Sequence, residues 1–250
     1  MHRYTMIYKT KGIILRSIRY GDTSLVVTAF TELFGIQTYM VNAARSAKKT
    51  AAKAILFQPS ALLEMQVYHQ EQKAMNRIKE SNWAFLYRHI LSDVVKNSIA
   101  LFMIEVLHKT LKQPEQNTDL FYFCEDALQQ LDDAPPGVAA NFPLYFILQL
   151  PHFSGLRLQD DYMPGKREIL DLQEGRFVAT VPQHAHYIEH EYARITAELL
   201  RIMQPHELAD IKLNKQMRRF LLSRYVSYYQ LHIQDFGNLK TLPVIQEVLE

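Results

Sequence analysis

The chain has 250 residues, of which 48% are hydrophobic, and a net charge of +2. This length and apolar content suit one large domain or two smaller ones with packed cores. No stretch reaches the roughly 20 apolar residues of a membrane span, and residues 1–10 lack the apolar run of a secretory signal. The single cysteine, Cys124, excludes a disulfide framework and a four-cysteine zinc site. We therefore expect a reduced, cytoplasmic protein.

Charge is unevenly distributed along the chain. The first 80 residues contain 12 Lys and Arg against 5 Asp and Glu, whereas the remaining 170 contain 16 against 21. An N-terminal part at +7 beside a body at −5 indicates a surface that binds a polyanion. The alternative is chance clustering of cations on a solvated surface.

The first 80 residues have the pattern of a small β barrel. Short apolar runs rich in β-branched and aromatic residues alternate with turn signals at Asp22-Thr23 and 33–35. In the first run Ile13, Ile14 and Leu15 are all apolar, which predicts a long strand bent by a bulge. The predicted strands are 5–20, 23–32, 36–45, 60–69 and 73–80.

The pattern beyond residue 80 is helical. A 3–4 spacing of apolar residues runs from Trp83 until Gln113-Pro114, and a second helix is expected at 117–131 with Thr118 as its N-cap. A very apolar third helix at 139–153 is expected to be central. The fold class is therefore α+β, with a barrel followed by an all-helical domain. The remaining predicted elements of the helical domain are a hairpin at 168–181 and helices at 184–203, 213–233 and 241–249.

Catalytic motifs are absent from the sequence. It has no G-x-S-x-G, no Walker P-loop and no G-x-G-x-x-G. Cys124 lies in an apolar helical run, so we expect a buried core thiol rather than a nucleophile paired with a histidine. We predict that the protein is not an enzyme and uses no cofactor.

One cluster has metal-like spacing. His186 and His190 are four residues apart, which would place them on one helix face beside His184, Glu189 and Glu191. No His-Glu-x-x-His is present, because the glutamates lie on the wrong side of that spacing. We expect a solvated first helical turn and assign no metal, with a metal-dependent hydrolase as a minor alternative.

Basic residues of the N-terminal part are the strongest functional signal. Cations that follow a phosphate backbone, with aromatic rings that stack on bases, are what a groove for single strands requires. Alternation predicts that Arg77 and Lys79 share a face of the fifth strand, and the segment 45–53 has four cations and no carboxylate. The candidate DNA-binding residues are Lys9, Lys11, Arg16, Arg19, Tyr39, Arg45, Lys48, Lys49, Lys53, Arg77 and Lys79. Core positions are an equally compatible alternative for the rings of Phe34 and Tyr39.

A second basic set lies late in the chain. Lys215, Arg218 and Arg219 fall on one helix face, with apolar residues beside them. This set could bind an acidic peptide with a hydrophobic end, or a second DNA segment, although a solvated helix face is equally compatible with it. The candidate docking residues are Lys212, Lys215, Arg218, Arg219 and Arg224.

Ordered segments along nearly the whole chain resemble the bacterial recombination mediators of the RecO family. Each segment is modest alone, but their order and spacing are specific. The segments are 10–16, 20–24, 30–35, 63–64, 78–80, 100–107 and 228–233, followed by Gly237, Leu239 and Lys240.

The resemblance implies an OB-fold nucleic-acid-binding domain at residues 1–80 and a helical domain at 81–250. It implies a role in DNA repair and homologous recombination in the cytoplasm, at the nucleoid. Members bind single- and double-stranded DNA, anneal complementary strands, act with RecR and help load the RecA filament on DNA coated by single-strand binding protein (SSB). The C-terminal tail of SSB binds the helical domain of the family, which we assign to the second basic set.

One departure from the family concerns zinc. Many members hold a four-cysteine zinc site near the hairpin, but residues 154–182 contain no cysteine here. The chain therefore resembles the zinc-free version. The alternative reading of its function is an OB-fold adaptor that binds a protein partner and touches nucleic acid only weakly.

Overall fold

The computed structural model describes residues 6–42, 55–70 and 73–249. The chain divides into two compact units, Met1–Tyr87 with Leu111–Gln129 and Arg88–Thr110 with Gln130–Glu250. Among the described residues, no helix combines the length and apolar character that crossing a membrane requires.

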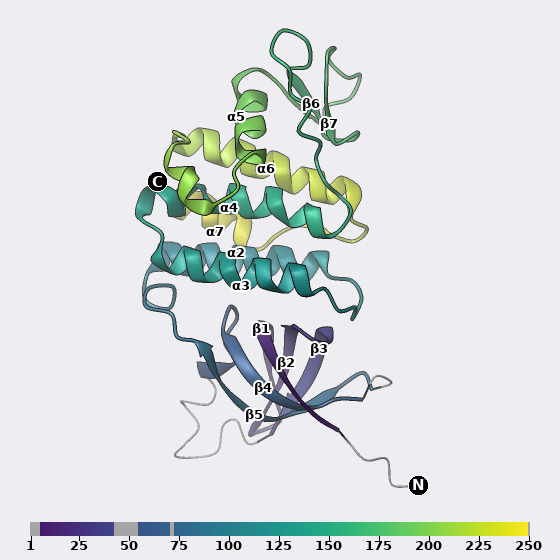
Figure 1. The fold of residues 1–250 in the computed structure, drawn as a ribbon, viewed down its shortest axis with the longest axis vertical. Helices are drawn as coiled ribbons and strands as arrows, with labels where there is room; N and C mark the ends of the chain where they lie inside the picture. Colours follow the sequence, from purple (N-terminus) through teal and green to yellow (C-terminus); the bar gives the residue numbers. More distant parts are fainter. Residues whose placement is uncertain (1–5, 43–54, 71–72, 250) are drawn as a thin grey trace. The chain divides into compact units, whose positions relative to one another are not determined.

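The first unit is built on a closed five-stranded barrel (Figure 1). Its strands close in the order β1-β2-β3-β5-β4, with β3 parallel to β5 and every other pair antiparallel. This is the arrangement of an OB fold, so the predicted five-stranded barrel and the α+β class are confirmed. The strands are β1 (Ile7–Tyr20), β2 (Ser24–Thr31), β3 (Gly35–Val41), β4 (Leu62–Tyr68) and β5 (Asn76–Phe85).

The long first strand carries the predicted bulge. The register of β1 against β2 shifts between Ile14 and Arg16, so Leu15 is the extra residue. The bend lets one strand pair with β4 along its first half and with β2 along its second, which closes the barrel. Side chains such as Ile14, Val27 and Leu63 fill the interior, and the alternate positions face outward.

The start of the first helix was predicted too early. β5 continues through Trp83, which pairs with Leu63 and packs against the barrel core, and α2 begins only at Val94. The Asp93 carboxylate accepts the N–H of Lys96 and caps that first turn. The apolar spacing from Trp83 onward is therefore a strand followed by a loop and a helix, because pairing with β4 outweighs the local helical pattern.

The second unit is helical. Its helix α4 is buried along almost its whole length and packs against α2, α5 and α6 (Figure 1), as expected for a central helix. The helix α3 starts in the barrel unit, and Asn117 rather than the predicted Thr118 caps it by accepting the Leu120 N–H. The helices are α2 (Val94–Thr110), α3 (Thr118–Asp133), α4 (Pro136–Gln149), α5 (His190–Leu200), α6 (Lys215–His232) and α7 (Thr241–Val248), with 3₁₀ turns η1 (Leu150–Phe153) and η2 (Pro205–Ala209).

A small three-stranded sheet replaces the simple hairpin that was predicted. The hairpin of β6 (Ile169–Asp171) and β7 (Arg176–Val178) is confirmed, and β8 (Tyr187–Ile188) adds to its other side in the order β7-β6-β8. The helix expected from residue 184 therefore begins at His190. A two-residue strand has too little pattern to be read from sequence and is set by its pairing with β6.

Candidate nucleic-acid interface

One row of side chains crosses the outer face of the barrel. Strand register pairs Ile18 with Val26, Val26 with Met40, and Met40 with Arg77, so the row runs over β1, β2, β3 and β5. Ile18 is 43% exposed, and Val26 and Met40 are half-buried. Tyr20, 59% exposed, follows Ile18 by two residues. The row thus presents apolar surface that ends in a guanidinium.

A hollow of about 530 Å³ adjoins the Met40–Arg77 end of this row. We call it the β3–β5 hollow. Asn76 accepts the N–H of Gln70 at 3.0 Å through its side chain and so holds the β4 end near the start of β5. No described carboxylate lines the hollow. Its lining residues are Met40, Tyr68, Gln70, Lys73, Met75, Asn76 and Arg77.

The chemistry of the β3–β5 hollow suits a nucleic-acid strand. Tyr68 offers a ring, Met40 and Met75 offer thioethers, and Lys73 and Arg77 are exposed cations. Neither cation forms an ion pair with a described residue. Cations that contact phosphates beside a ring that stacks on bases form a single-strand groove.

Of the predicted cations that the structure describes, only Arg77 lines the β3–β5 hollow. Arg16 lies on the same outer face, opposite Thr28, whereas Arg19 lies opposite Leu25, whose side chain points into the core. Sequence reasoning missed Tyr68 and Lys73. Tyr68 could have been found, since it is an outward position of the predicted alternating strand.

The structure contradicts the prediction that Tyr39 belongs to the DNA-binding surface. Its side chain is fully buried in the barrel core, where burial raises the pKa of its phenol, so the ring is not available for stacking. Phe34 stacks on His69 with ring centroids 3.7 Å apart and packs against the same core. The sequence pattern alone could not separate these rings from the exposed Tyr20 and the half-buried Tyr68.

Lys79 does not share a face with Arg77, as strand alternation had predicted. The register of β4 against β5 shifts between Gln66 and Val67, and Lys79 is the residue left without a partner in the ladder. It is exposed and lines a separate hollow together with Phe57. The bulge breaks the period of two, so alternation cannot be extended across it.

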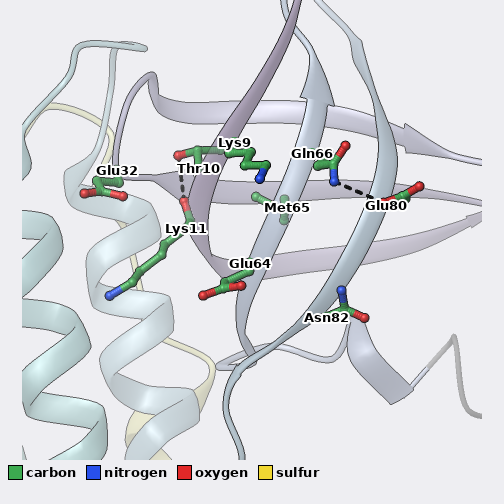
Figure 2. A pocket seen from close by; sticks show the side chains of 9 residues that line it. All are labelled: Lys9, Thr10, Lys11, Glu32, Glu64, Met65, Gln66, Glu80 and Asn82. Carbon is green, nitrogen blue, oxygen red and sulfur yellow. Dashed lines mark hydrogen bonds between the residues drawn. The ribbon is translucent and has the colours of Figure 1, made fainter.

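Lys9 and Lys11 lie on a different part of the barrel with mixed charge. They line a hollow of about 320 Å³ that also holds Glu32, Glu64 and Glu80 (Figure 2). Figure 2 shows the Lys11 side chain extending away from Glu80. The carboxylates make this surface less attractive to phosphates than the β3–β5 hollow.

The amine of Lys11 is bound within the barrel unit. Its Nζ donates to both carboxylate oxygens of Glu125, at 2.8 and 3.1 Å, and lies 5.7 Å from the ring centroid of Tyr122. The hydrogen bond to Glu125 raises the pKa of Lys11. Lys11 therefore ties β1 to α3, whatever else it contacts. The predicted residues Arg45, Lys48, Lys49 and Lys53 lie outside the described residues.

The second basic set makes several internal contacts in the helical unit. Arg218 donates to the Asn141 side chain at 3.0 Å, and burial lowers the pKa of its guanidinium. Arg224 lies 5.2 Å from the ring centroid of Phe220. Lys212 precedes α6 and donates to the Ala209 carbonyl, while Lys215 and Arg219 contact the end of α7. All five candidates thus come from α6 or the residues just before it, but each is already engaged.

The regions that match known proteins together cover nearly the whole chain. The family described as recombination protein O N terminal matches residues 6–87, and that described as recombination protein O C terminal matches residues 91–243. The chain belongs to the RecO family. It is similar to the DNA repair protein RecO of Bacteroides fragilis, with 34% identity over 98% of this chain and 100% of the relative. The DNA repair protein RecO of Phocaeicola vulgatus is 32% identical over 97% and 99%.

In this RecO-family chain, the carboxylates of Asp161 and Asp171 hold the small sheet in place. Asp161 accepts the Phe177 N–H at 2.9 Å and pairs with Arg167 at 3.0 Å. Asp171 accepts the N–H groups of Gln173 and Glu174 and so closes the turn between β6 and β7. Residues 154–182 contain no cysteine, so they do not fit a four-thiolate zinc ion.

The predicted histidine pair does not share a helix face. His186 precedes β8, and α5 begins only at His190, so the four-residue spacing spans a loop and a strand. His184 instead lies 3.3 Å from the buried carboxylate of Asp171. The one group in the described chain with metal-like proximity is His89, Asp132 and Asp133. There the Asp132 carboxylate already accepts three backbone N–H groups.

Cys124 is buried, as predicted. Only 2% of its surface is exposed, and burial raises the pKa of its thiol well above the usual value. A buried neutral thiol is a poor nucleophile, because the thiolate is the reactive form.

Proposed function

We propose that this chain is a DNA repair and homologous recombination mediator that acts without catalysis. It binds single- and double-stranded DNA, anneals complementary strands, and with RecR helps load the RecA filament on SSB-coated DNA in the cytoplasm, at the nucleoid. Membership of the RecO family and the names of its relatives support the repair role. Residues 1–80, together with the rest of β5, supply the nucleic-acid domain, and the following helices supply partner contacts.

The β3–β5 hollow, in which no described residue supplies a carboxylate, is the observation that carries the DNA-binding part of this proposal. Lys73 and Arg77 contact phosphates there, and Tyr68 stacks on an unpaired base. Contacts of this kind follow the backbone and carry little sequence information. Cations that neutralise phosphates also reduce the repulsion between two strands, so complementary strands can pair without chemistry or a nucleotide cofactor.

Partner docking belongs to the helical unit. We propose that the acidic, hydrophobic C-terminal tail of SSB binds near Lys215 and Arg219 on α6, which brings the protein to coated DNA. The positive charge of this helix within an otherwise acidic region supports the assignment.

One observation supports the alternative function, an adaptor that binds a protein partner. The hollow around Glu64 and Glu80 has mixed charge and suits a protein partner better than a phosphate backbone. DNA affinity separates the two readings, because an adaptor would bind DNA only weakly.

A salt titration of DNA binding tests the proposal. Fluorescence anisotropy of the full chain with a labelled single strand should give a plot of log K against log salt with a slope of about −3, if about four phosphates are neutralised. Replacing Lys73 and Arg77 by Glu together should weaken binding to every sequence and make the slope shallower by at least about 1.

The matched control is Lys166→Glu, because Lys166 is also exposed but lies in the helical unit. It changes the net charge in the same direction, by half as much as the double variant, and should leave the slope near the wild-type value. The proposal would be overturned if the affinity did not respond to salt, or if Lys166→Glu lost as much DNA affinity as the variant with both Lys73 and Arg77 replaced.

A further inference from the structure

The last turn of α7 is docked on the basic helix α6. Arg219 donates through Nε to the Gln246 carbonyl at 2.6 Å and through its terminal nitrogen to the Glu247 carboxylate at 3.2 Å. Lys215 reaches the Glu247 carbonyl at 3.4 Å. Carbonyls at a helix C-terminus carry partial negative charge, so these cations meet both the dipole and the side chain of the segment.

The other end of α7 is held by one carboxylate. Glu105 of α2 accepts the backbone N–H groups of Lys240 and Thr241, both at 2.8 Å, and the Thr241 hydroxyl at 2.7 Å. Within α7, Ile245 is fully buried while Val244 is half exposed. The helix is thus short and anchored at defined points.

An apolar trough runs beside the docked segment. It encloses about 480 Å³ between the start of α2, the start of α4 and the end of α7. Val248 and Leu249 line it from one side, and Pro136 and Ala139 from the other. Asp93 and Lys96 also line the trough, as does Glu247, which links it to the two cations of α6 that contact this residue.

The end of α7 has the charge and apolar character expected of a ligand for the cations of α6. Residues 245–249 read Ile-Gln-Glu-Val-Leu, with a carboxylate followed by apolar side chains. The cations of α6 that hold this segment would complement an acidic peptide with an apolar end in the same way. The family match ends at residue 243, so these residues lie beyond the matched region.

We propose that the end of α7 is an internal occupant of the α6 surface formed by Lys215 and Arg219, and that an acidic peptide with an apolar end docks there by displacing it. The proposal rests on the tail docking described under the proposed function and adds its regulation. In this arrangement the measured affinity for the peptide equals the intrinsic affinity reduced by the fraction of molecules in which α7 is released. Any change that loosens α7 without altering Lys215 or Arg219 should strengthen peptide binding.

The test uses the full chain and a fluorescent peptide of four aspartates followed by valine and leucine. Hydrogen exchange of residues 241–249 is measured with and without saturating peptide. The peptide should accelerate exchange there, because it displaces α7. Glu105→Ala should raise the peptide affinity by about fivefold, since it removes the cap that anchors α7. Arg219→Ala should weaken peptide binding.

The matched control is Glu198→Ala, which removes an exposed helical carboxylate that pairs with Arg194, away from the contacts of α7. It should leave the peptide affinity unchanged. If the peptide binds while residues 241–249 keep their protection, and Glu105→Ala binds like wild type, displacement is wrong and tail docking stands. If neither wild type nor Glu105→Ala binds the peptide, both are wrong, while the DNA-binding proposal is judged separately by its salt titration.

Discussion

Tyr68 of β4 and Arg77 of β5 lie directly opposite each other across an antiparallel pair, and both line the β3–β5 hollow. A ring and a guanidinium on neighbouring strands can contact a base and its phosphate at the same time. This pair leads to the most specific prediction about DNA binding.

Tyr68→Ala should weaken single-strand binding by about 1–3 kcal/mol and affect duplex binding much less. Stacking needs an unpaired base, whereas duplex bases are already stacked. The measurement is the dissociation constant for a single strand and for the matching duplex at one salt concentration. Tyr68→Phe keeps the ring and serves as the control, which should bind like wild type. Equal losses for both DNA forms would argue against stacking.

The segment 45–53 supplies a second prediction, although it lies outside the described residues. Replacing Lys48, Lys49 and Lys53 by Glu should weaken binding to oligonucleotides of any sequence by about the same factor, because cation–phosphate contacts do not read bases. Competition between oligonucleotides of different composition measures this. A loss confined to one sequence would show that these lysines contact bases instead.

Asp132 should control acid stability of the helical unit. Burial disfavours its charge, but N–H groups of Arg88, Ile90 and His89 outweigh that and lower the pKa of its carboxyl. A lowered native pKa gives stability that is complete above the unfolded value of about 3.9 and is lost as pH falls through the native pKa. Asp132→Ala should destabilise the protein by about 2–4 kcal/mol at pH 7.

Urea unfolding of wild type and Asp132→Ala at several pH values measures this dependence. The difference in unfolding free energy should be constant from pH 7 to about 5 and shrink below about pH 4, as the wild-type carboxylate is protonated. The comparison is Asp133→Ala, since Asp133 is exposed. A wild-type to Asp132→Ala difference that stays the same at pH 3 would contradict the assigned role.

Lys11 should matter more for stability than for DNA binding. The Glu125 side chain is only 6% exposed, so Lys11→Met would leave a largely buried carboxylate without its cation. We expect a loss of about 1–3 kcal/mol in unfolding free energy and a smaller change in DNA affinity than for Arg77→Met. Adding Glu125→Gln to Lys11→Met should recover part of the stability. A larger DNA defect in Lys11→Met than in Arg77→Met would place Lys11 in the interface after all.

Several features were determined by the sequence alone, because they depend on local patterns. Alternation and turn residues located all five strands, and the apolar run around Phe142 identified the central helix. Ordered segments along the chain pointed to the RecO family, which the family matches establish. The net positive charge of the first 80 residues by itself indicates a surface that binds a polyanion.

Only the tertiary structure decided which side chains share a surface. The closure of the barrel buried Tyr39 and brought Lys73, Tyr68 and Arg77 together, although they come from different strands and a connecting segment. A bulge in β5 places Lys79 and Arg77 on different faces. Trp83, predicted to lie in a helix, lies in β5 because it pairs with Leu63 of β4. Composition and the spacing of apolar residues indicate which secondary structure each residue favours. Strand register and barrel closure arise from contacts between residues distant in sequence, and they determine which side chains each residue contacts.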